Sequence, residues 1–459
     1  MLNRPFRKVK RLHLVGIGGI GMSGIAEILL DMGYQVTGSD LRTSPLTQRL
    51  SRLGAKIDYG HRGENVVGAD VVVISSAIRE SNPEVTAARS FRIPLIRRAE
   101  MLGELMRMKF GIAIAGTHGK TTTTSMIGEV MTSGGCDPTI VVGGRVIALG
   151  TNALLGKGNY LVAEADEFDR SFLRLIPTIA VITTLEAEHM DCYTSLGDLK
   201  SAFVEFANKV PFYGSVILCL DEPSLQAIIP RVERELITYG LTKGADIRGD
   251  GLRFQGRESR FLVHRGKETL GEVRLQVPGE HNVKNALAAI TLGLELEIPF
   301  PQIASSLQGF RGVHRRFEIK GESQGVMVVD DYAHHPTEIE ATLQAARAGW
   351  KRRIVAVFQP HLYTRTRDFC HHFGKALSSA DLLVVTEIYP AREDPIPGVS
   401  GELVARAARE YGHPAVHWVP RKEDLPSFLS KIVRQGDMVV TMGAGDIWTV
   451  GEKLLELLG

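Results

Sequence analysis

Apolar runs alternate with amphipathic segments in three successive blocks of the chain. The first block contains the runs LHLVGIG, YQVTGSD and DVVVISSAI, with the amphipathic segment GMSGIAEILLDMG after the first of them. The second block contains FGIAIAGTHGK, YLVAEAD, IAVITTL and SVILCLD, and the third contains GVMVVDDYAHHP, RIVAVFQPH, DLLVVTEIYP and DMVVTMGAGDIW. Short apolar runs separated by helical patterns are typical of parallel strands covered by helices. The pattern therefore predicts an α/β fold with a parallel sheet in each block.

Two segments depart from this alternation. Residues 236–278 alternate short polar and apolar stretches, which predicts an antiparallel insertion, and GEHNVKNALAAITLGLEL after it predicts a capped helix. The stretch GFRGVHRRFEIK, residues 309–320, is rich in basic side chains and precedes a new strand. We interpret it as a hinge or a domain junction.

Composition narrows the class of protein. The 459 residues are 44% hydrophobic and 23% charged, an ordinary balance for a globular chain of several domains. Lys and Arg number 54 against 52 Asp and Glu, which excludes the charge signature of a nucleic-acid binder. The chain lacks a long apolar run, and its basic N-terminus lacks a signal-peptide cleavage site, so we expect no membrane span. Its four cysteines have no C-x-x-C spacing, which indicates reduced thiols in a cytoplasmic protein.

The first glycine cluster is GIGGIGMSG. Gly16, Gly18 and Gly21 satisfy the pattern G-x-G-x-x-G directly after a predicted strand and at the start of a predicted helix. Glycines at these positions let the backbone approach a diphosphate at the positive end of the helix. Asp40 ends the next strand, where an acid would meet a ribose hydroxyl. The motif does not define the nucleotide: NAD is the usual ligand, and close helix–strand packing is the alternative reason for the glycines.

The second glycine cluster, GTHGKTTTT, is more specific. Gly116 and Gly119 free the loop to wrap phosphates, Lys120 supplies a cation for the β- and γ-phosphates, and the Thr121 hydroxyl suits Mg²⁺. The first glycine of the P-loop pattern G-x-x-x-x-G-K-[ST] is replaced by Ile114, which predicts a shorter and tighter loop. This cluster predicts ATP hydrolysis or phosphoryl transfer.

Two acidic stretches follow apolar strands in the same block. NYLVAEADEFDR ends an apolar run at Glu164, and a carboxylate there would face the same crevice as the P-loop. Asp166, Glu167 and Asp169 follow, so a solvated surface loop is the alternative. We expect Glu164 to bind Mg²⁺. In AVITTLEAEHMDCY, acids surround His189, which is either a hydrogen-bonded loop residue or a ligand of a second metal, although Mg²⁺ rarely binds imidazole.

Taken together, the motifs resemble those of the Mur ligases of peptidoglycan synthesis, and the match covers the whole chain. GTHGKTTT, EADEFDRSFL, EHMDCY, GEHNVKNALAA, GVHRRFE, DDYAHHPTEI and YTRTRD occur in the family's order. The N-terminal HLVGIGGIGMSGIAEIL is similar to the member that adds L-alanine to UDP-N-acetylmuramate. The member that recycles murein tripeptide is the alternative within the family. An NAD-dependent dehydrogenase is the distant alternative, and it leaves the P-loop-like cluster unexplained.

The resemblance implies three domains. They are a Rossmann-like UDP-sugar-binding domain in residues 1–108, a central P-loop-type ATPase domain in residues 109–313, and a Rossmann-like amino-acid-binding domain in residues 314–459. It also implies that ATP, Mg²⁺, UDP-N-acetylmuramate and L-alanine are the ligands, and that the amide forms through an acyl phosphate. We expect a monomer or homodimer with no nucleic-acid or membrane partner.

The resemblance also implies roles for individual residues. The predicted catalytic residues are Lys120, Glu164, His189, His334 and Arg365. The predicted ATP-binding residues are Gly116, Thr117, His118, Gly119, Lys120, Thr121, Thr122, Asn282, Asn285 and Arg316. The predicted UDP-sugar-binding residues are Gly16, Gly18, Gly19, Gly21, Ser39, Asp40 and Ser75. Tyr332, His334 and Arg365 are the predicted amino-acid and carboxylate contacts, and Thr121, Glu164 and His189 are the predicted metal ligands.

Several positions depart from the family's pattern. Leu362 stands where an arginine usually follows QPH, and Arg392 begins a stretch where the family usually has a GE-P-I loop. Thr184 and Glu188 stand where Asn and Asp are commoner. The first two departures lie in the third domain, so the resemblance constrains the ATP site more tightly than the amino-acid site.

Overall fold

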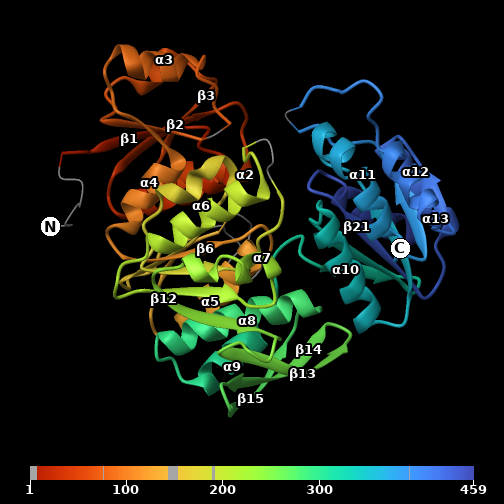
Figure 1. Cartoon of the computed structure of the whole chain (residues 1–459). Coiled ribbons are helices and arrows are strands. Elements are labelled where there is room, and N and C mark those ends of the chain that lie inside the picture. The colour runs from red at the N-terminus through yellow and green to blue at the C-terminus, as the bar shows by residue number, and fades with distance from the viewer. Residues whose placement is uncertain (1–7, 76, 143–152, 189–191, 392) are drawn as a thin grey trace. The chain divides into compact units, whose positions relative to one another are not determined.

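Three sheets organise the computed structural model, which describes residues 8–75, 77–142, 153–188, 192–391 and 393–459 (Figure 1). The chain divides into two units. The first comprises Met1–Asp250, Leu262–Gly271 and Lys284–Leu307, and the second comprises Gly251–Phe261, Glu272–Val283 and Gln308–Gly459. Among the described residues, no helix has both the length and the apolar character that crossing a bilayer requires.

The N-terminal sheet has five parallel strands in the order β3-β2-β1-β4-β5. Its strands are β1 (Arg11–Val15), β2 (Gln35–Asp40), β3 (Lys56–Tyr59), β4 (Val71–Ile74) and β5 (Leu95–Arg97), and its helices are α1 (Ile20–Asp31), α2 (Pro45–Arg52), α3 (Pro83–Ser90) and α4 (Arg98–Met106). This strand order is that of one half of a Rossmann fold. The order reverses between β1 and β4, and ligands of such sheets bind outside the carboxyl ends of the strands at that point.

The central sheet has ten strands in the order β15-β14-β13-β12-β11-β10-β6-β9-β7-β8. The strands are β6 (Phe110–Ala115), β7 (Thr139–Val141), β8 (Ala153–Leu154), β9 (Tyr160–Glu164), β10 (Ile179–Ile182), β11 (Ser215–Cys219), β12 (Glu235–Gly240), β13 (Ile247–Gln255), β14 (Glu258–Arg265) and β15 (Glu268–Leu275). The helices are α5 (Lys120–Ser133), α6 (Leu196–Asn208), α7 (Pro223–Gln226), α8 (Glu280–Glu295) and α9 (Phe300–Gly309). Strand β6, which precedes the second glycine cluster, lies between β9 and β10 and is parallel to both.

The predicted antiparallel insertion is wrong at its start. The segment Glu235–Gly240 forms β12, which pairs in parallel with β11 on one side and β13 on the other. Only the later part fits the prediction, because the very short connections β13–β14 and β14–β15 allow nothing but hairpins. The alternation of polar and apolar residues did not distinguish a parallel strand inside the sheet from the first strand of a hairpin.

The C-terminal sheet has the order β16-β17-β21-β18-β19-β20. Its strands are β16 (Glu318–Ser323), β17 (Val326–Asp331), β18 (Arg353–Phe358), β19 (Leu382–Val385), β20 (Val416–Trp418) and β21 (Asp437–Met442), and its helices are α10 (Pro336–Gly349), α11 (Tyr363–Leu377), α12 (Glu402–Glu410), α13 (Leu425–Ile432) and α14 (Trp448–Leu458). The edge strand β16 is antiparallel to β17, and the other pairings are parallel.

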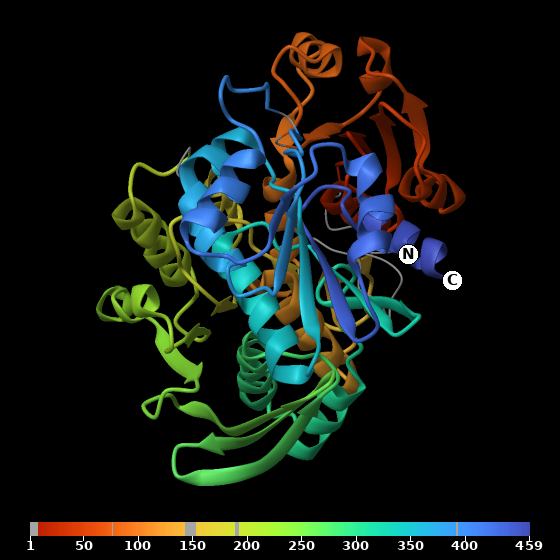
Figure 2. The ribbon, with the colours of Figure 1, turned by 90° about the vertical axis from the view of Figure 1, so that its right-hand side faces the viewer.

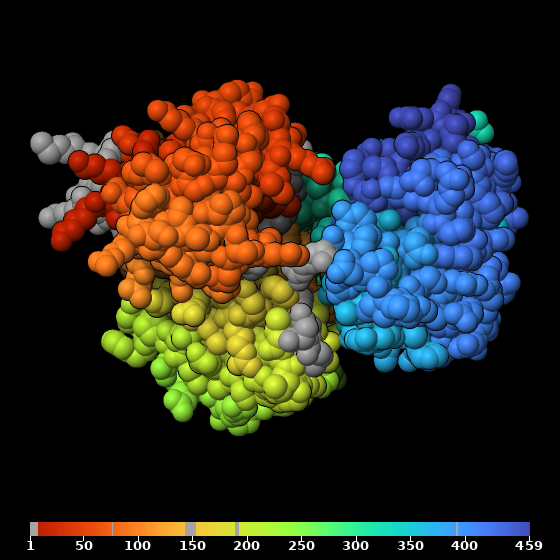
Figure 3. Space-filling view, turned by 90° about the horizontal axis from the view of Figure 1, so that it is seen from above, coloured from red at the N-terminus to blue at the C-terminus, as the bar shows by residue number. Residues whose placement is uncertain are grey.

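Helices cover both faces of this C-terminal sheet (Figure 2). Ile339, Phe373 and Val404 from α10, α11 and α12 belong to the core on one face. Leu429 from α13 and Leu454 from α14 belong to the core on the other. The segments around this sheet form one continuous body, cyan to blue in the space-filling view (Figure 3). The predicted α/β class is thus confirmed in all three sheets, with strands where the four apolar runs of the third block predict them.

Candidate active site

The first glycine-rich loop leaves β1 and enters α1. The backbone N–H groups of Gly16 and Ile17 both donate to the carbonyl oxygen of Ser39, at 2.8 and 3.0 Å. Gly16 has a φ of 76°, a conformation that glycine adopts without strain. The N–H of Gly18 donates to Asp40 Oδ2 at 2.8 Å. The loop is therefore fastened to the carboxyl end of β2, and the anion-attracting end of α1 begins beside it.

Asp40 holds this loop through backbone hydrogen bonds. Its Oδ2 accepts from Gly18, and its Oδ1 accepts from the N–H of Leu41 at 2.7 Å and from that of Arg42 at 3.4 Å. The carboxylate thus has a structural role that the sequence did not indicate. Its predicted contact with a ribose hydroxyl stays a prediction.

Two side chains lie against the glycines of the first loop. A Cβ atom added at Gly16 would lie 3.7 Å from Ser75 Oγ, which places this predicted UDP-sugar residue beside the loop. A Cβ atom added at Gly21 would lie 2.9 Å from Arg98 Nη1. Arg98 is the first residue of α4 and was not predicted as a site residue. It brings a guanidinium, which binds phosphate or carboxylate well, to a loop that has no cation of its own.

The second loop, residues 116–119, joins β6 to α5. Ile114, which stands where a P-loop has its first glycine, is fully buried within β6. Because the strand continues to Ala115, the loop is short, as the sequence predicted. Gly116 has a φ of 136°, and a Cβ atom there would collide with Thr183 Oγ1. A Cβ atom at Gly119, whose φ is 79°, would lie 2.6 Å from Asn285 Oδ1. Both glycines are therefore required by close approaches as well as by conformation.

Lys120 lies at the start of α5 and is paired with a buried carboxylate. Its Nζ donates to Glu167 Oε2 at 2.9 Å, to Glu167 Oε1 at 3.1 Å and to the carbonyl oxygen of Gly116 at 2.5 Å. The side chain of Glu167 is fully buried, and its backbone carbonyl accepts from Tyr193 Oη at 2.6 Å. The sequence singled out Glu164 in this acidic stretch, but Glu167 is the acid that holds Lys120.

Burial and neighbouring charges shift the pKa values of Glu167 and Lys120. Burial raises the pKa of Glu167 to about 7, with Lys120 opposing the change and the carboxylates of Asp166 and Glu188 adding to it. Burial also lowers the pKa of Lys120, but the carboxylates of Glu167, Asp166 and Glu188 outweigh it and hold that pKa above its ordinary value. The ammonium therefore stays charged, and four ionisable groups share a small region beside the loop.

The strands on either side of β6 bring polar groups to the loop. In the pairing of β6 with β9, Ile114 faces Glu164, so this predicted metal ligand ends the strand next to the loop strand. On the other side, Thr184 Oγ1 accepts from the N–H of His118 at 2.8 Å, and Thr183 Oγ1 donates to its carbonyl oxygen at 2.5 Å. The threonine at position 184, a departure from the family's pattern, thus shapes the loop.

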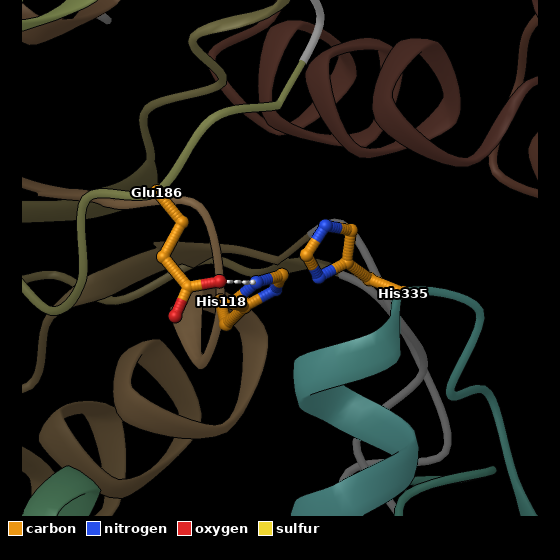
Figure 4. A group of neighbouring side chains, drawn as sticks. All are labelled: His118, Glu186 and His335. Atoms are coloured by element: carbon orange, nitrogen blue, oxygen red, sulfur yellow. Dashed lines mark ion pairs between the residues drawn. The ribbon is translucent and has the colours of Figure 1, made fainter. Parts of the chain in front are cut away.

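His118 is paired with a further acid of this edge. Its Nε2 lies 3.5 Å from Glu186 Oε2, the contact dashed in Figure 4, which also labels His335 at the start of α10. Thr121 lies in the first turn of α5, and Asn285 of α8 accepts from Thr123 Oγ1 at 3.1 Å. The predicted metal ligand His189 and its neighbour Asp191 lie outside the described residues.

The first unit also contains a cavity of about 300 Å³. The residues that line it are Arg97, Arg98, Ala99, Asp166, Phe168, Asp169, Ser171 and Arg174. Arg98 also lies against the first loop, and Asp166 directly precedes the Glu167 that holds Lys120. A molecule in this cavity would therefore meet the guanidinium groups of Arg97, Arg98 and Arg174 and the carboxylates of Asp166 and Asp169.

In the C-terminal unit, Tyr332 lies under two guanidinium groups. The Cζ atoms of Arg315 and Arg316 lie 4.9 and 5.4 Å from the centre of its ring. Arg315 also donates from Nε to Asp330 Oδ2 at 2.9 Å, so it fixes this arrangement. His334 Nδ1 lies 3.0 Å from the carbonyl oxygen of Tyr332. The predicted residues Arg316, Tyr332 and His334 are thus brought together, and Arg315 is an unpredicted fourth member.

The start of α11 lies close to this group. The ring of His334 packs edge-on against the ring of His361 at 5.9 Å. Leu362 precedes α11 with a φ of 69°, which is rare for a leucine, and Arg365 lies in the first turn of the helix. Glu393 accepts from the N–H of Thr364 at 3.0 Å. Its neighbour Arg392 lies outside the described residues. Asn282, at the start of α8, donates from Nδ2 to the carbonyl oxygen of Pro278 at 2.7 Å.

These features define a nucleotide-binding α/β protein in which a Rossmann-like sheet precedes a P-loop-type sheet. Sequence profiles of the Mur ligase family match in three parts: the one described as the Mur ligase family, catalytic domain, matches residues 11–110, the middle domain matches 114–293, and the glutamate ligase domain matches 315–445. The chain belongs to the Mur ligase family, whose members are ATP-dependent amide-forming ligases.

The chain is similar to known proteins over almost its full length. The UDP-N-acetylmuramate–L-alanine ligase of Geobacter sp. (strain M21) is 54% identical over 451 residues, 98% of each chain. That of Salinibacter ruber is 56% identical over 453 residues, 98% of this chain and 95% of the relative. The crystal structure of the UDP-N-acetylmuramate–alanine ligase of Thermotoga maritima has a TM-score of 0.81 at 31% identity and covers 97% of this chain and 98% of that one.

Proposed function

We propose that this protein joins L-alanine to the lactoyl carboxylate of UDP-N-acetylmuramate, with ATP converted to ADP and phosphate, as a step in making peptidoglycan precursors. The observation that carries the proposal is the cavity in the first unit that Arg98 and Asp166 both line, because Arg98 lies against the first glycine-rich loop and Asp166 precedes the Glu167 that holds Lys120. A nucleotide sugar on the first loop would extend along Arg98 toward the ATP on the second. The full-length relatives with this activity support the same substrates.

The first step makes the carboxylate reactive. A lactoyl carboxylate oxygen attacks the γ-phosphorus of ATP, the bond to the β–γ bridging oxygen breaks, and ADP leaves. Two anions meet in this step, so cations must offset their repulsion. Lys120 supplies one at the second loop. Glu167 holds its ammonium in place at 2.9 Å, which limits the rotamers that the lysine can adopt.

The second step forms the amide. The uncharged amine of L-alanine attacks the acyl carbon, a tetrahedral intermediate forms, and phosphate leaves with the electrons of the carbon–oxygen bond. The amine loses a proton to a neighbouring carboxylate or to water. Tyr332, His334 and Arg365 are the residues that we assign to the amino acid and the carboxylates in this step, since cations and donors there would orient both substrates.

Mg²⁺ fits the oxygen donors beside the second loop. The Thr121 hydroxyl in the first turn of α5 and the Glu164 carboxylate at the end of β9 are hard ligands of the type that Mg²⁺ prefers. A bound Mg²⁺ would neutralise charge on the phosphate oxygens. We retain His189 as the proposed ligand of a second ion. We also place the reaction in the cytoplasm, where ATP is made and used, and expect a monomer or homodimer.

A phosphate-release assay tests the proposal. Release from ATP should require both UDP-N-acetylmuramate and L-alanine, and Lys120→Ala is the matched inactive control. Glycine and L-serine in place of L-alanine measure the strictness of the amino-acid site. Release with a murein tripeptide but not with L-alanine would instead favour the recycling ligase, and tight binding of NADH without any UDP-sugar binding would favour the dehydrogenase.

A further inference from the structure

A buried carboxylate ties together the carboxyl edge of the N-terminal sheet. Glu84, in the first turn of α3, has a fully buried side chain. Its Oε2 accepts from Ser39 Oγ at 2.6 Å and lies 3.4 Å from His13 Nε2. Its Oε1 accepts from Asn65 Nδ2 at 2.5 Å and from the N–H of Arg62 at 3.3 Å. One side chain thus joins β1, β2, α3 and the segment after β3.

These contacts keep Glu84 ionised. Burial alone would raise its pKa, but the hydrogen bonds from His13, Ser39 and Asn65 outweigh burial and hold the pKa below its ordinary value. An ionised carboxylate accepts hydrogen bonds and cannot donate one. Every close polar partner of Glu84 must therefore direct a hydrogen atom toward it.

This requirement determines which ring nitrogens carry protons. The hydroxyl of Ser39 donates its single proton to Glu84. In the contact of 3.0 Å between Ser39 Oγ and His61 Nδ1, Ser39 must therefore accept, and His61 must donate from Nδ1. In its neutral form the His61 imidazole has one N–H, here on Nδ1, and Nε2 then carries a lone pair. His13 donates from Nε2 to Glu84, and its Nδ1 lies 2.9 Å from Thr37 Oγ1.

His61 lies at the edge where a nucleotide would bind. The carbonyl oxygen of the same Ser39 accepts the amides of Gly16 and Ile17, and Gly60 donates to the carbonyl oxygen of Asp40 at 2.9 Å. The His61 side chain is 14% exposed, whereas that of Glu84 is not exposed. Among the described residues, the contacts recorded for His61 involve Nδ1. A hydrogen-bond acceptor thus lies beside the glycine-rich loop.

We propose that Nε2 of His61 accepts a hydrogen bond from the uridine of the nucleotide-sugar substrate, and that Ser39 and Glu84 are positioning residues that fix its tautomer. The inference rests on the proposed function, because it takes the first loop to bind a uridine nucleotide. Uridine offers three donors: N3–H of the base and the 2′- and 3′-hydroxyls of the ribose. Cytidine has a lone pair at N3, so a contact with the base would discriminate between these nucleosides.

Substrate analogues test the contact. We compare kcat/KM for UDP-N-acetylmuramate and its 2′-deoxy, 3′-deoxy and cytidine analogues in the native protein and in His61→Leu, with the exposed His371→Leu as control. One analogue should lose about 3- to 10-fold in the native protein, the size of one neutral hydrogen bond. In His61→Leu, kcat/KM for UDP-N-acetylmuramate should fall to the value that the native protein shows with that analogue. The kcat/KM of His61→Leu for the analogue should be no lower than this. Equal analogue penalties in the two proteins would overturn the proposal.

Imidazole ¹⁵N NMR tests the tautomer. In protein with labelled histidines, the His61 signals are assigned by their loss in His61→Leu. We expect a proton on Nδ1, a bare Nε2 and a shift of the Nε2 signal when UDP is added. In Ser39→Ala the tautomer should become mixed and the affinity for UDP should fall. A proton on Nε2 in the native protein would contradict the proposal.

The two proposals can fail separately. If phosphate release does not depend on UDP-N-acetylmuramate, the proposed function fails. The contact is then measured by calorimetry with UDP, 2′-deoxy-UDP, 3′-deoxy-UDP and CDP, where an equal affinity of His61→Leu and the native protein for UDP would overturn it.

Discussion

The two glycine-rich loops of the first unit occupy the same place in their sheets but are held differently. Each follows a buried parallel strand and precedes a helix. The first is fastened by backbone groups and by the carboxylate of Asp40, which accepts hydrogen bonds from backbone N–H groups. The second is fastened by the hydroxyls of Thr183 and Thr184 and encloses the buried pair of Lys120 and Glu167.

The source of the cation is the clearest difference. Lys120 is the residue directly after Gly119, whereas Arg98 reaches Gly21 from α4, which is remote in the sequence. The diphosphate of a UDP-sugar does not react, so its site needs only to bind it. The γ-phosphoryl group of ATP is transferred, so its site must also stabilise the charge of the transition state. The comparison therefore assigns binding to the first loop and chemistry to the second.

Replacing Lys120 should produce the largest effect on this comparison. We expect Lys120→Ala to reduce kcat by about 1,000-fold, the scale of one lost charge-stabilising group, while the KM for UDP-N-acetylmuramate changes little. Single-turnover phosphate release measures it. A variant that retains a tenth of the native kcat would contradict the assignment of chemistry to the second loop.

The control for this variant must separate folding from catalysis. Lys120→Ala leaves Glu167 buried without its cation, which destabilises a protein independently of its activity. The double variant Lys120→Met with Glu167→Gln removes both charges. It should regain most of the lost thermal stability and remain inactive.

The sequence predicted what is local in these loops. The glycines, Lys120 and the strand before each loop follow from short-range patterns, and the parallel strands of the three sheets follow from the apolar runs. Arg98 and His61 could not be predicted in the same way, because long-range packing brings them to the first loop. Glu167 was visible only as one of several acids after β9, since spacing does not reveal which carboxylate turns inward.

Removing Glu164 should give the next largest effect. We expect Glu164→Ala to lower kcat about 100-fold at a fixed Mg²⁺ concentration, a part of the several kcal/mol that a metal ion contributes, and to raise the Mg²⁺ concentration needed for half-maximal activity. The surface acid Glu205, replaced by Ala, is the control. An unchanged Mg²⁺ dependence would mean that this carboxylate is not a ligand.

A change in the first loop should affect binding and leave the chemistry intact. A Cβ atom at Gly18 would lie 2.8 Å from Asp40 Oδ2 and 2.8 Å from Thr47 Cγ2, so Gly18→Ala must disturb the anchor of the loop. We expect the KM for UDP-N-acetylmuramate to rise about 10-fold, the scale of a lost hydrogen bond to a charged group. Calorimetry with ATP should give the native affinity. Gly309→Ala is the matched control, because its Cβ atom would meet open space. An equal loss of ATP binding would erase the distinction between the loops.

The last prediction concerns the pH dependence of stability. Burial raises the pKa of Glu167 from 4.5 to about 7, so the folded protein binds more protons than the unfolded chain between these values. The contribution of this group to the free energy of unfolding is therefore complete below about pH 4.5 and is lost as the pH rises through 7, by at most about 3 kcal/mol. Glu167→Gln cannot titrate and should lack this decline. Urea unfolding of the native protein and of Glu167→Gln at pH 5 and pH 8 measures the difference. A native protein that gains stability relative to the variant as the pH rises would mean that Lys120 dominates burial, and that the second loop is held by an ordinary ion pair.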